Sequence, residues 1–413
     1  MTNRRRVVIT GIGAVTPIGL TRAGLWAGLR RQRSAVGSLT RFDPSPFRSH
    51  NAAEVNDFVP GDHMEARRAR RLDRFGQLSV ATARMALEDA GLDLAREDRE
   101  RIGAMMGTAL GGVGYAEEQL GVFLTQGLKA VDATLALAVF GGASSCNIAI
   151  EFGVQGPNST NAMSCASGTI AIGEAFRQIR DGYADVMIAG GAEAPLAPLC
   201  FGAFAIIRAM STRNDDPAAS SRPFDRDRDG FVMGEGSAVL ILEEYERAKA
   251  RGAPVYAEVA GYGTTNDAHH MTAPLPDGAQ AARSMRIALG DAHVAPGEVG
   301  YVNAHGSSTP LNDPTETLAI KRVFGDRAYA VPVSSTKGYY GHALGASGAI
   351  EAAISALSIT HEWLPPTVNL ERPDDACDLD YIPASGRDAR VEHVLSNSFG
   401  FGGINAALVL RRV

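Results

Sequence analysis

A single cysteine among small residues is the first candidate for chemistry in this chain. Cys165 lies within residues 161–168, and apolar residues recur after it at spacings of four and three, which predicts a helix that ends at Gly182. Cys165 would lie at the N-terminus of this helix, where partial positive charge and free backbone N–H groups favour a thiolate. The stretch predicts a nucleophile, although a buried and unreactive cysteine fits the same local pattern.

Two histidines, each located beyond an apolar segment, could work with such a nucleophile. His305 follows the predicted strand 299–303, and His342 follows the predicted strand 330–334. Because α/β proteins gather their sites at strand ends, we expect both histidines to belong to one site. A cysteine hydrolase is an alternative, but residues 163–167 lack the papain-type signature around the cysteine.

The glycine-dense loop 397–405 precedes the predicted last strand, 406–410. Glycines at this density let backbone N–H groups converge on an anion, as an oxyanion hole requires. A plain tight turn would explain the same composition.

Two further stretches resemble binding motifs, one for dinucleotides and one for calcium, but each lacks a required residue. Gly11-x-Gly13 resembles the start of a dinucleotide fingerprint, but position 16 is threonine and no acidic partner follows. Residues 225–230 imitate a calcium-binding EF-hand loop, but glutamate occurs at position 11 of that loop and glycine at position 12. We therefore predict no dinucleotide and no metal.

Composition excludes several classes of protein. The chain has 413 residues, of which 45% are hydrophobic and 21% are charged, as in a globular protein, and its net charge of −6 argues against general nucleic-acid binding. The four cysteines are scattered, which indicates a reducing compartment without disulfides. Polar residues and Pro17 interrupt the apolar run after Arg4–Arg6, so we expect no signal peptide, no membrane span and a cytoplasmic protein.

Hydrophobic patterning predicts strands that alternate with helices, hence βαβ units and largely parallel sheets. Beyond those already given, the predicted strands are 5–11, 101–107, 184–191, 237–242 and 255–263, and the predicted helices are 72–90, 243–251 and 279–289. The sequence of the predicted strand 255–263 is similar to that of strand 5–11, and both lead into Gly-x-Gly, which suggests an internal duplication. Because no low-complexity linker separates the halves, we expect them to pack as one body.

The candidate residues, taken together, resemble the β-ketoacyl-acyl-carrier-protein synthase II family of the thiolase superfamily, which includes type II polyketide ketosynthases. The likeness runs in order over essentially the whole chain and rests on residues 164–168, 211–215, 221–224, 303–306, 337, 341–342 and 397–405. It implies an α/β, thiolase-like duplicated fold in five αβαβα layers, usually dimeric. The two halves would be residues 1–251, carrying the nucleophile, and 252–413, carrying the two histidines.

The resemblance also implies an acyltransferase mechanism without metal or organic cofactor. Cys165 would accept an acyl chain from a carrier protein, and malonyl carrier protein would then lose carbon dioxide and attack the acyl-enzyme. His305 and His342 would assist decarboxylation and donate from Nε2 to the enolate oxygen, while backbone N–H groups of Cys165 and Phe401 would form an oxyanion hole. Lys337 would be the active-site lysine, with Glu351 as its charge partner.

Further positions follow from the same resemblance. Phe401 matches a gating residue, and Phe231, Leu110 and Gly400 match gating or pocket positions. The partner would be an acidic acyl carrier protein, which requires a basic docking surface. Its candidates are Arg67, Arg68, Arg70 and Arg71 before the predicted helix 72–90, together with Arg208. A solvated helix face would also explain the arginine cluster.

Departures from the housekeeping pattern leave the pathway open. Residues 338–340 and 140–145 differ from the segments usual in fatty acid enzymes, and residues 312–317 and 328–332 look closer to type II polyketide ketosynthases. Such ketosynthases often pair with a chain-length factor, so the dimer could be a homodimer or a heterodimer. A non-catalytic scaffold and a coenzyme A thiolase are further alternatives, although loop 397–405 lacks the second cysteine of thiolases. Acyl chain length and saturation stay open.

Overall fold

The computed structural model describes residues 4–413. The strands of its large sheet are β1 (Val7–Thr16), β2 (Gly19–Leu20), β5 (Ile102–Gly107), β6 (Asn158–Asn161), β7 (Val186–Glu193), β8 (Gly236–Glu244), β9 (Ala257–Asn266), β10 (Tyr301–Asn303), β11 (Val333–Ser334), β14 (His393–Gly400) and β15 (Ile404–Arg411). Two short pairs lie outside it: β3 (Gly37–Ser38) with β4 (Asn51–Ala52), and β12 (Trp363–Leu364) with β13 (Arg387–Asp388).

The helices that cover and connect these strands are α1 (Thr21–Arg30), α2 (Ala66–Ala69), α3 (Arg74–Asp89), α4 (Val113–Gln126), α5 (Leu135–Ala138), α6 (Ala143–Phe152), α7 (Ser167–Arg180), α8 (Pro198–Ile206), α9 (Tyr245–Ala250), α10 (Ala279–Ala292), α11 (Asn312–Phe324), α12 (Lys337–Tyr340) and α13 (Ser347–His361). The 3₁₀ turns Ser164–Ala166 and Leu344–Ala346 lead directly into α7 and α13.

The large sheet consists of two halves with the same strand order. One half runs β6-β5-β7-β8-β1 and the other runs β11-β10-β14-β15-β9, and they join where β1 pairs with β9. Each strand of one half therefore has a counterpart in the other, which confirms the duplication expected from the echo between residues 5–11 and 255–263. The exact division into residues 1–251 and 252–413 stays a prediction.

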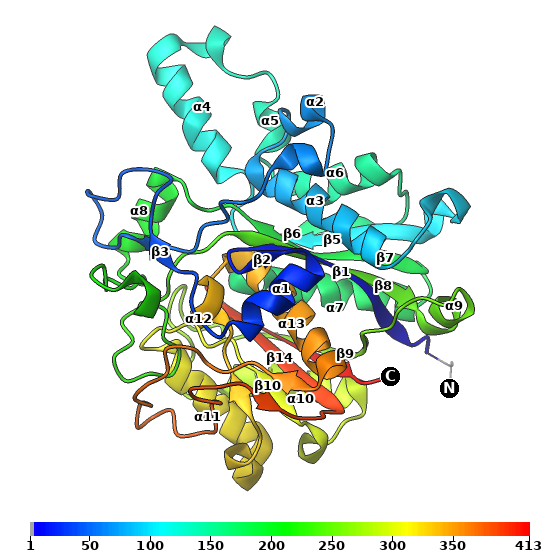
Figure 1. Cartoon of the computed structure of the whole chain (residues 1–413), viewed down its shortest axis with the longest axis vertical. Helices are drawn as coiled ribbons and strands as arrows, with labels where there is room; N and C mark the ends of the chain where they lie inside the picture. The colour runs from blue at the N-terminus through cyan, green and yellow to red at the C-terminus, as the bar shows by residue number, and fades with distance from the viewer. Residues whose placement is uncertain (1–3) are drawn as a thin grey trace.

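Helices and strands alternate in five layers (Figure 1). α3 and α6 cover the outer face of the first half, and α10 with α11 covers the outer face of the second. α7 and α13 lie in the middle layer, where they contact each other and strands of both halves. A single core cluster includes residues of both halves, such as Ile9, Ile172 and Leu408, so the halves pack as one body, as expected.

The prediction of largely parallel sheets is wrong. β5 is parallel to β6 and β7, and β10 is parallel to β11 and β14. β8 is antiparallel to both its neighbours, as is β15. The loop between β14 and β15 is too short for the helical crossover that parallel strands need, so the chain returns antiparallel.

The Gly-x-Gly sequences of β1 and β9 serve helix packing. A Cβ added at Gly13 would lie 2.0 Å from Thr82 O in α3, and one added at Gly263 would lie 2.2 Å from Ser284 O in α10. Each glycine pair lets a helix backbone approach its strand directly. This contact explains why the first pair imitates a dinucleotide motif without being one.

Helix ends follow local capping rules. The predicted helix 72–90 begins at Arg74, because the Asp73 carboxylate accepts a hydrogen bond of 2.8 Å from Phe75 N. Gly91, with φ of 58°, follows its C-terminal end as predicted. Local side-chain chemistry therefore decides this boundary.

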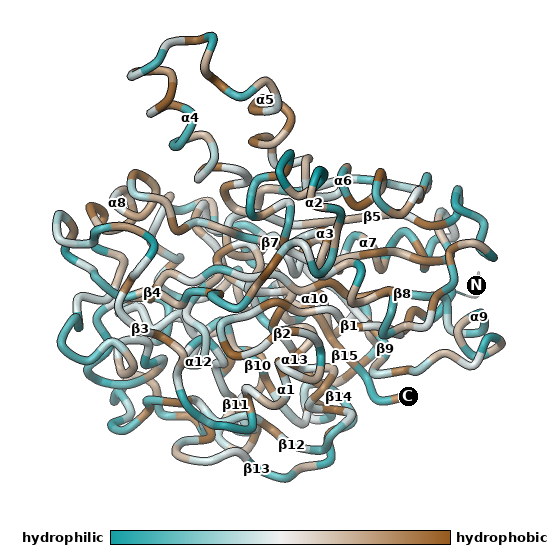
Figure 2. The backbone as a smooth tube through the Cα atoms, turned by 45° about the horizontal axis from the view of Figure 1, so that its top comes forward, coloured by the Kyte–Doolittle hydropathy of each residue, from teal (hydrophilic) through white to brown (hydrophobic). Residues whose placement is uncertain are grey.

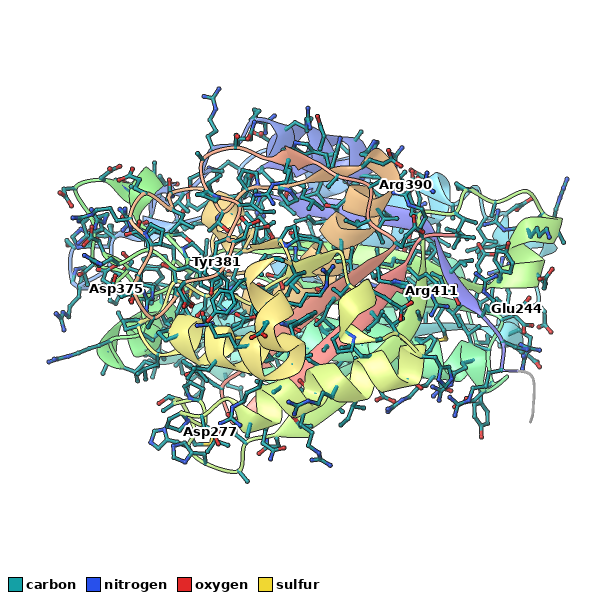
Figure 3. The ribbon with its side chains drawn as sticks, turned by 90° about the horizontal axis from the view of Figure 1, so that it is seen from below. Glu244, Asp277, Asp375, Tyr381, Arg390 and Arg411 are labelled. Atoms are coloured by element: carbon teal, nitrogen blue, oxygen red, sulfur yellow. The ribbon has the colours of Figure 1, made fainter. Side chains whose placement is uncertain are left out.

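Residues of high hydropathy are concentrated in the strands and the middle helices, and polar residues lie toward the periphery (Figure 2). Seen from below, Glu244 and Asp277 lie at the edges of the molecule, whereas Arg411 lies nearer its middle (Figure 3). Among residues 4–413, none of the helices combines the length and the apolar character needed to cross a membrane.

Candidate active site

Cys165 lies in the 3₁₀ turn that opens α7. The preceding residue, Ser164, has a left-handed φ of 51°, which makes the turn sharp. The Ser167 hydroxyl stabilises the turn, because its Oγ lies within hydrogen-bond distance of two carbonyl oxygens, Ser164 O at 2.7 Å and Thr108 O at 3.0 Å. The predicted location of Cys165 at a helix N-terminus is therefore confirmed.

The environment of the Cys165 thiol differs from the sequence-based expectation. Only 8% of Cys165 is exposed. Burial raises the pKa of the thiol to about 11, and the Ser164 hydroxyl and the Lys337 charge oppose the rise. The resting side chain is therefore a thiol, and the reaction must remove its proton during attack.

His305 and His342 lie together beside this cysteine. Their ring centroids are 5.3 Å apart at an interplanar angle of 78°. Both are buried, and burial lowers the pKa of each histidine well below its usual value, with Lys337 adding to the effect. Both rings are consequently neutral at physiological pH.

Hydrogen bonds at Nδ1 orient both rings. Lys337 Nζ lies 3.5 Å from His305 Nδ1 and donates to His305 O over 2.6 Å. Ser347 Oγ lies 2.8 Å from His342 Nδ1. An ammonium can only donate, so His305 Nδ1 accepts and its hydrogen resides on Nε2.

Lys337 and Glu351 form a fully buried ion pair behind His305. Lys337 Nζ donates to Glu351 Oε1, and the side chains are 1% and 0% exposed. Burial raises the pKa of Glu351 to about 7, and the Lys337 charge opposes this rise. The pairing predicted from the sequence is present in the structure.

A second buried carboxylate holds the loop that carries His305. Glu316 of α11 accepts hydrogen bonds of 2.8 Å from both His305 N and Gly306 N. Asn397 Nδ2 donates to the same carboxylate over 3.3 Å. Glu316 therefore connects the turn after β10 with the start of the glycine-dense loop.

That loop passes directly over the nucleophile. A Cβ added at Gly400 would lie 3.1 Å from Cys165 N, so glycine lets the loop approach the nucleophile turn closely. The backbone N–H of Phe401 faces the Cys165 sulfur and slightly opposes the rise in the pKa of the thiol. Two backbone N–H groups, those of Cys165 and Phe401, thus belong to adjoining segments beside one sulfur, as an oxyanion hole requires.

A cavity of about 260 Å³ opens at these groups. Its lining includes Cys165, His305, Phe399, Phe401 and Arg208. Charged and polar side chains, among them Arg208, Asp267 and Asn405, share this lining with the aromatic residues.

The aromatic and aliphatic candidates surround the same site. The Phe231 ring lies 5.5 Å from the His342 ring and 5.9 Å from the Phe204 ring, and Phe204 stacks on Phe401 at 6.3 Å. Leu110 packs against the cluster that contains Cys165 and Phe231. The predicted pocket residues are therefore together.

The arginines predicted to dock the carrier protein differ in their exposure and in their contacts. Arg208 is exposed at the cavity, and Arg67, Arg70 and Arg71 are exposed on or beside α2, away from the cavity lining. Arg68 instead pairs with Glu151 at 2.7 Å and donates to Asn147 O over 3.0 Å. Arg68 therefore fastens α2 to α6.

Sequence reasoning missed Phe204, Phe399, Glu193 and Glu316. The single signal for Glu316 is its position on the buried face of α11, where an acidic residue needs a partner. Glu193 ends the apolar strand β7 and gives the same signal.

The EF-hand imitation is explained by packing. The Asp225 carboxylate accepts from Arg222 Nε, Asp227 N, Glu371 N and Arg372 N over 2.8–3.0 Å, which saturates it. Across residues 4–413, no group of three or more histidine, cysteine or acidic side chains is arranged to hold a metal ion.

Comparisons with known proteins match this site and fold. The family models of the beta-ketoacyl synthase N-terminal and C-terminal domains match residues 4–248 and 256–371. The chain is 47% identical over 409 residues to 3-oxoacyl-[acyl-carrier-protein] synthase 2 of Synechocystis sp., covering 99% of this chain and 98% of that one.

Two solved structures share the whole fold. One is the complex of a type II polyketide synthase acyl-carrier protein with its ketosynthase, at a TM-score of 0.93 and 37% identity, covering 100% of both chains. The other is the ishigamide ketosynthase/chain length factor, at a TM-score of 0.93 and 38% identity, covering 99% of this chain and 100% of that one. The cysteine, the histidine pair and the duplicated five-layer fold agree with these matches, and the chain belongs to the β-ketoacyl synthase family.

Proposed function

We propose that this protein is a β-ketoacyl-acyl-carrier-protein synthase, which condenses an acyl chain with malonyl carrier protein through an acyl-Cys165 intermediate. The observation that carries the proposal is a cavity lined by Cys165, His305 and Phe401, with the neutral His342 ring packed directly against His305.

The first step is acyl transfer. The Cys165 sulfur forms a bond to the thioester carbon, the bond to the carrier sulfur breaks, and the thiol proton ends on the departing carrier thiol. Backbone N–H groups of Cys165 and Phe401 stabilise the oxyanion of the tetrahedral intermediate. Because burial raises the pKa of the resting thiol to about 11, the thiol loses its proton as the new carbon–sulfur bond forms.

The second step is decarboxylation and condensation. The carboxylate of the malonyl group departs as carbon dioxide, and its bonding electrons become an enolate. His305 and His342 donate from Nε2 to the enolate oxygen. The enolate carbon then attacks the acyl thioester, and Cys165 departs as a thiolate that recovers a proton. Neutral donors suit this step because they stabilise the enolate oxygen without quenching the carbanion.

Lys337 acts on this chemistry through His305. Its ammonium fixes the donor tautomer of His305, and Glu351 compensates the buried charge. Lys337 and Glu351 are therefore positioning residues in this proposal.

An acyl carrier protein delivers both substrates in this proposal. Arg208 is exposed at the cavity, where an acidic carrier would approach. Arg67 and Arg71 offer further exposed cations, whereas Arg68 is engaged with Glu151. We propose that the reaction takes place in the cytoplasm, where the carrier-bound substrates are made.

Fatty acid elongation is the preferred pathway, because the Synechocystis relative is more similar to this chain than the polyketide structures are. Work in a type II polyketide system, with a chain-length factor as partner, is the second candidate. The shared fold of the ishigamide ketosynthase/chain length factor supports it.

A second subunit would cover an apolar surface on the projecting α4–α5 excursion (Figure 1). Leu124 and Leu128 are 72% and 75% exposed, and Leu120, Phe123 and Leu137 are also exposed. An apolar patch of this kind marks a protein interface. We propose that it mediates dimerisation, with a second copy or with a homologous partner.

Intact-mass spectrometry tests the function directly. The purified chain is mixed with acyl and malonyl carrier proteins beside a Cys165→Ala variant. An acyl adduct on the unmodified protein alone, with formation of β-ketoacyl carrier protein, supports the condensing enzyme. Acylation without elongation indicates a missing partner subunit and favours the polyketide pathway. No adduct at all contradicts the assignment of Cys165 as nucleophile.

A further inference from the structure

Glu193 is a fully buried carboxylate near the nucleophile that the proposed mechanism does not use. It ends β7 and is 0% exposed. Oε1 accepts from Thr108 Oγ1 over 3.0 Å and from Leu110 N over 3.1 Å. Oε2 accepts from Ala109 N over 2.5 Å and from Gly345 N over 2.9 Å. One side chain thereby joins two segments of the site that are far apart in the sequence.

The first of these segments carries Leu110. Leu110 packs on the cluster that includes Cys165 and also lines an apolar slot of about 380 Å³ between α4 and α8, together with Phe204. Leu110 is shared by the slot and by the cluster around Cys165, so an acyl chain that extended from Cys165 into the slot would run along Leu110. The position of the Leu110 loop would then affect access to the slot.

The second segment carries His342. Gly345 lies in the 3₁₀ turn before Ser347, whose hydroxyl contacts His342 Nδ1. A Cβ added at Gly345 would lie 2.4 Å from Ala109 N and 2.6 Å from Glu193 Oε2, so the Gly345 turn and the Leu110 loop are in direct contact. Movement of either segment disturbs the other.

The duplication explains why a carboxylate occupies this place. The turn before α13 repeats the nucleophile turn before α7: Leu344 and Ser164 have φ of 40° and 51°, and Gly345 corresponds to Cys165. β7 and β14 occupy equivalent positions in the two halves of the sheet. At the end of β14, Phe401 N–H approaches Cys165, whereas at the end of β7 the Glu193 carboxylate accepts from Gly345 N. The Glu193 carboxyl group thus lies in the second copy of the nucleophile turn, where burial raises its pKa to about 7.

We propose that Glu193 is a positioning residue that fastens the Leu110 loop to the His342 turn and so sets how readily long acyl chains reach Cys165. This inference rests on the proposed acyl-transfer function.

Glu193→Gln tests the contact of Glu193 with Leu110 separately from its other hydrogen bonds. All backbone partners of Glu193 are donors, so a glutamine amide can satisfy only those that face its oxygen. With the NH₂ group at the Oε1 position, the Thr108 hydroxyl can rotate to accept, Ala109 and Gly345 keep their acceptor, and Leu110 N–H loses its own. The substitution therefore releases Leu110 selectively.

The measurement is the rate of Cys165 acylation, by intact mass, from a short and from a long saturated acyl carrier protein. We expect Glu193→Gln to raise the long-to-short rate ratio about tenfold, the effect of losing one charge-assisted hydrogen bond. Glu244→Gln is the matched control, because Glu244 likewise accepts from two backbone N–H groups but lies at the rim, and its ratio should equal that of the unmodified protein (Figure 3).

A double-mutant cycle with Leu110→Ala tests whether Glu193→Gln changes the ratio through Leu110. In the Leu110→Ala background Glu193→Gln should change the ratio by less than about twofold, because the Leu110 side chain is already absent. An equal shift in both backgrounds, or equal slowing of both substrates, overturns the inference.

If Glu193→Gln does not fold, Thr108→Val removes one donor from the same carboxylate and should shift the ratio in the same direction, about threefold. An unchanged ratio there also overturns the inference. No adduct on the unmodified protein would overturn the proposed function and this inference together, whereas an adduct with unchanged ratios overturns only the inference.

Discussion

At the scale of single residues, burial controls the chemistry of the site. The same desolvation that raises the pKa of Cys165 lowers the pKa of both histidines, so thiol and imidazoles are all neutral at rest. A neutral site suits substrates that bring their own charge, because the malonyl carboxylate and the developing enolate then meet donors without a competing anion. Helix position alone would suggest a thiolate, and burial reverses that suggestion.

The lowered histidine pKa values predict a flat pH dependence for decarboxylation. Each imidazole stays neutral until the pH falls below its folded-state pKa, which lies well below 6.5. Titration of the histidines should therefore leave the rate of carbon dioxide release from malonyl carrier protein unchanged from about pH 8 to about pH 6 and lower it only in more acid solution, whereas a step near pH 7 would report Glu351, whose pKa is about 7. A decline centred near pH 6.5 would show that the histidines titrate normally.

The buried pair of Lys337 and Glu351 predicts a strong coupling in stability. Lys337→Met leaves Glu351 without its partner and should lower the free energy of unfolding by about 3–5 kcal/mol in denaturant titrations. Lys337→Met combined with Glu351→Gln should lose clearly less than the sum of the single changes. Additive losses would contradict the pairing. Arg390→Met breaks the exposed pair with Glu392 and serves as the control, with little expected change.

At the scale of elements, close contacts between helices and strands position the site. Glycines in β1 and β9 admit α3 and α10, and Gly348 at the start of α13 meets Thr169 of α7, because a Cβ there would lie 2.1 Å from Thr169 Oγ1. The nucleophile helix and its counterpart therefore cross at their N-terminal ends. The two turns that precede these helices are brought together as a result.

Substitution of a packing glycine should be costly, and substitution of an open one should not. In Gly263→Ala the new Cβ meets Ser284 O at 2.2 Å, which should destabilise the protein by about 2 kcal/mol or more. Gly290→Ala places its Cβ in open space on the same helix, α10, and should stabilise by about 0.5–1 kcal/mol. Thermal or chemical unfolding compares the two. Equal effects would mean that close approach of α10 to β9 is not required.

At the scale of the whole molecule, the two halves share one fold but contribute different residues to the site. One copy of the turn carries Cys165 and the other carries Gly345, while the histidines come from the second half. The site forms only where the halves meet, so neither half by itself contains the complete set.

The apolar surface of the α4–α5 excursion predicts how subunits associate. Leu124→Asp with Leu128→Asp should convert the proposed dimer into a monomer, measured by light scattering after size-exclusion chromatography, because each change places a charge on the surface to be buried. Leu318→Asp alters an exposed leucine of α11 and is the control, with no change of mass expected. A dimer that persists in the double variant would place the interface elsewhere.

Much of this protein was predictable from sequence because the signals are local. Helix periodicity after Cys165, the apolar strands and the paired Gly-x-Gly stretches each act over a few residues, and the elements they predict are present in the structure with shifted ends. The cap at Asp73, which starts α3 two residues later than predicted, was not among these predictions. The sequence alone therefore determined the elements, the duplication and the residues available for chemistry.

Only the tertiary structure decided the antiparallel strands, the raised pKa of Cys165, the engagement of Arg68 with Glu151 and the network around Glu193. Strand order and desolvation depend on residues far apart in the chain, as with Glu193 and Gly345, which are 152 positions apart. No local pattern encodes such pairs, because their geometry arises from the packing of whole elements.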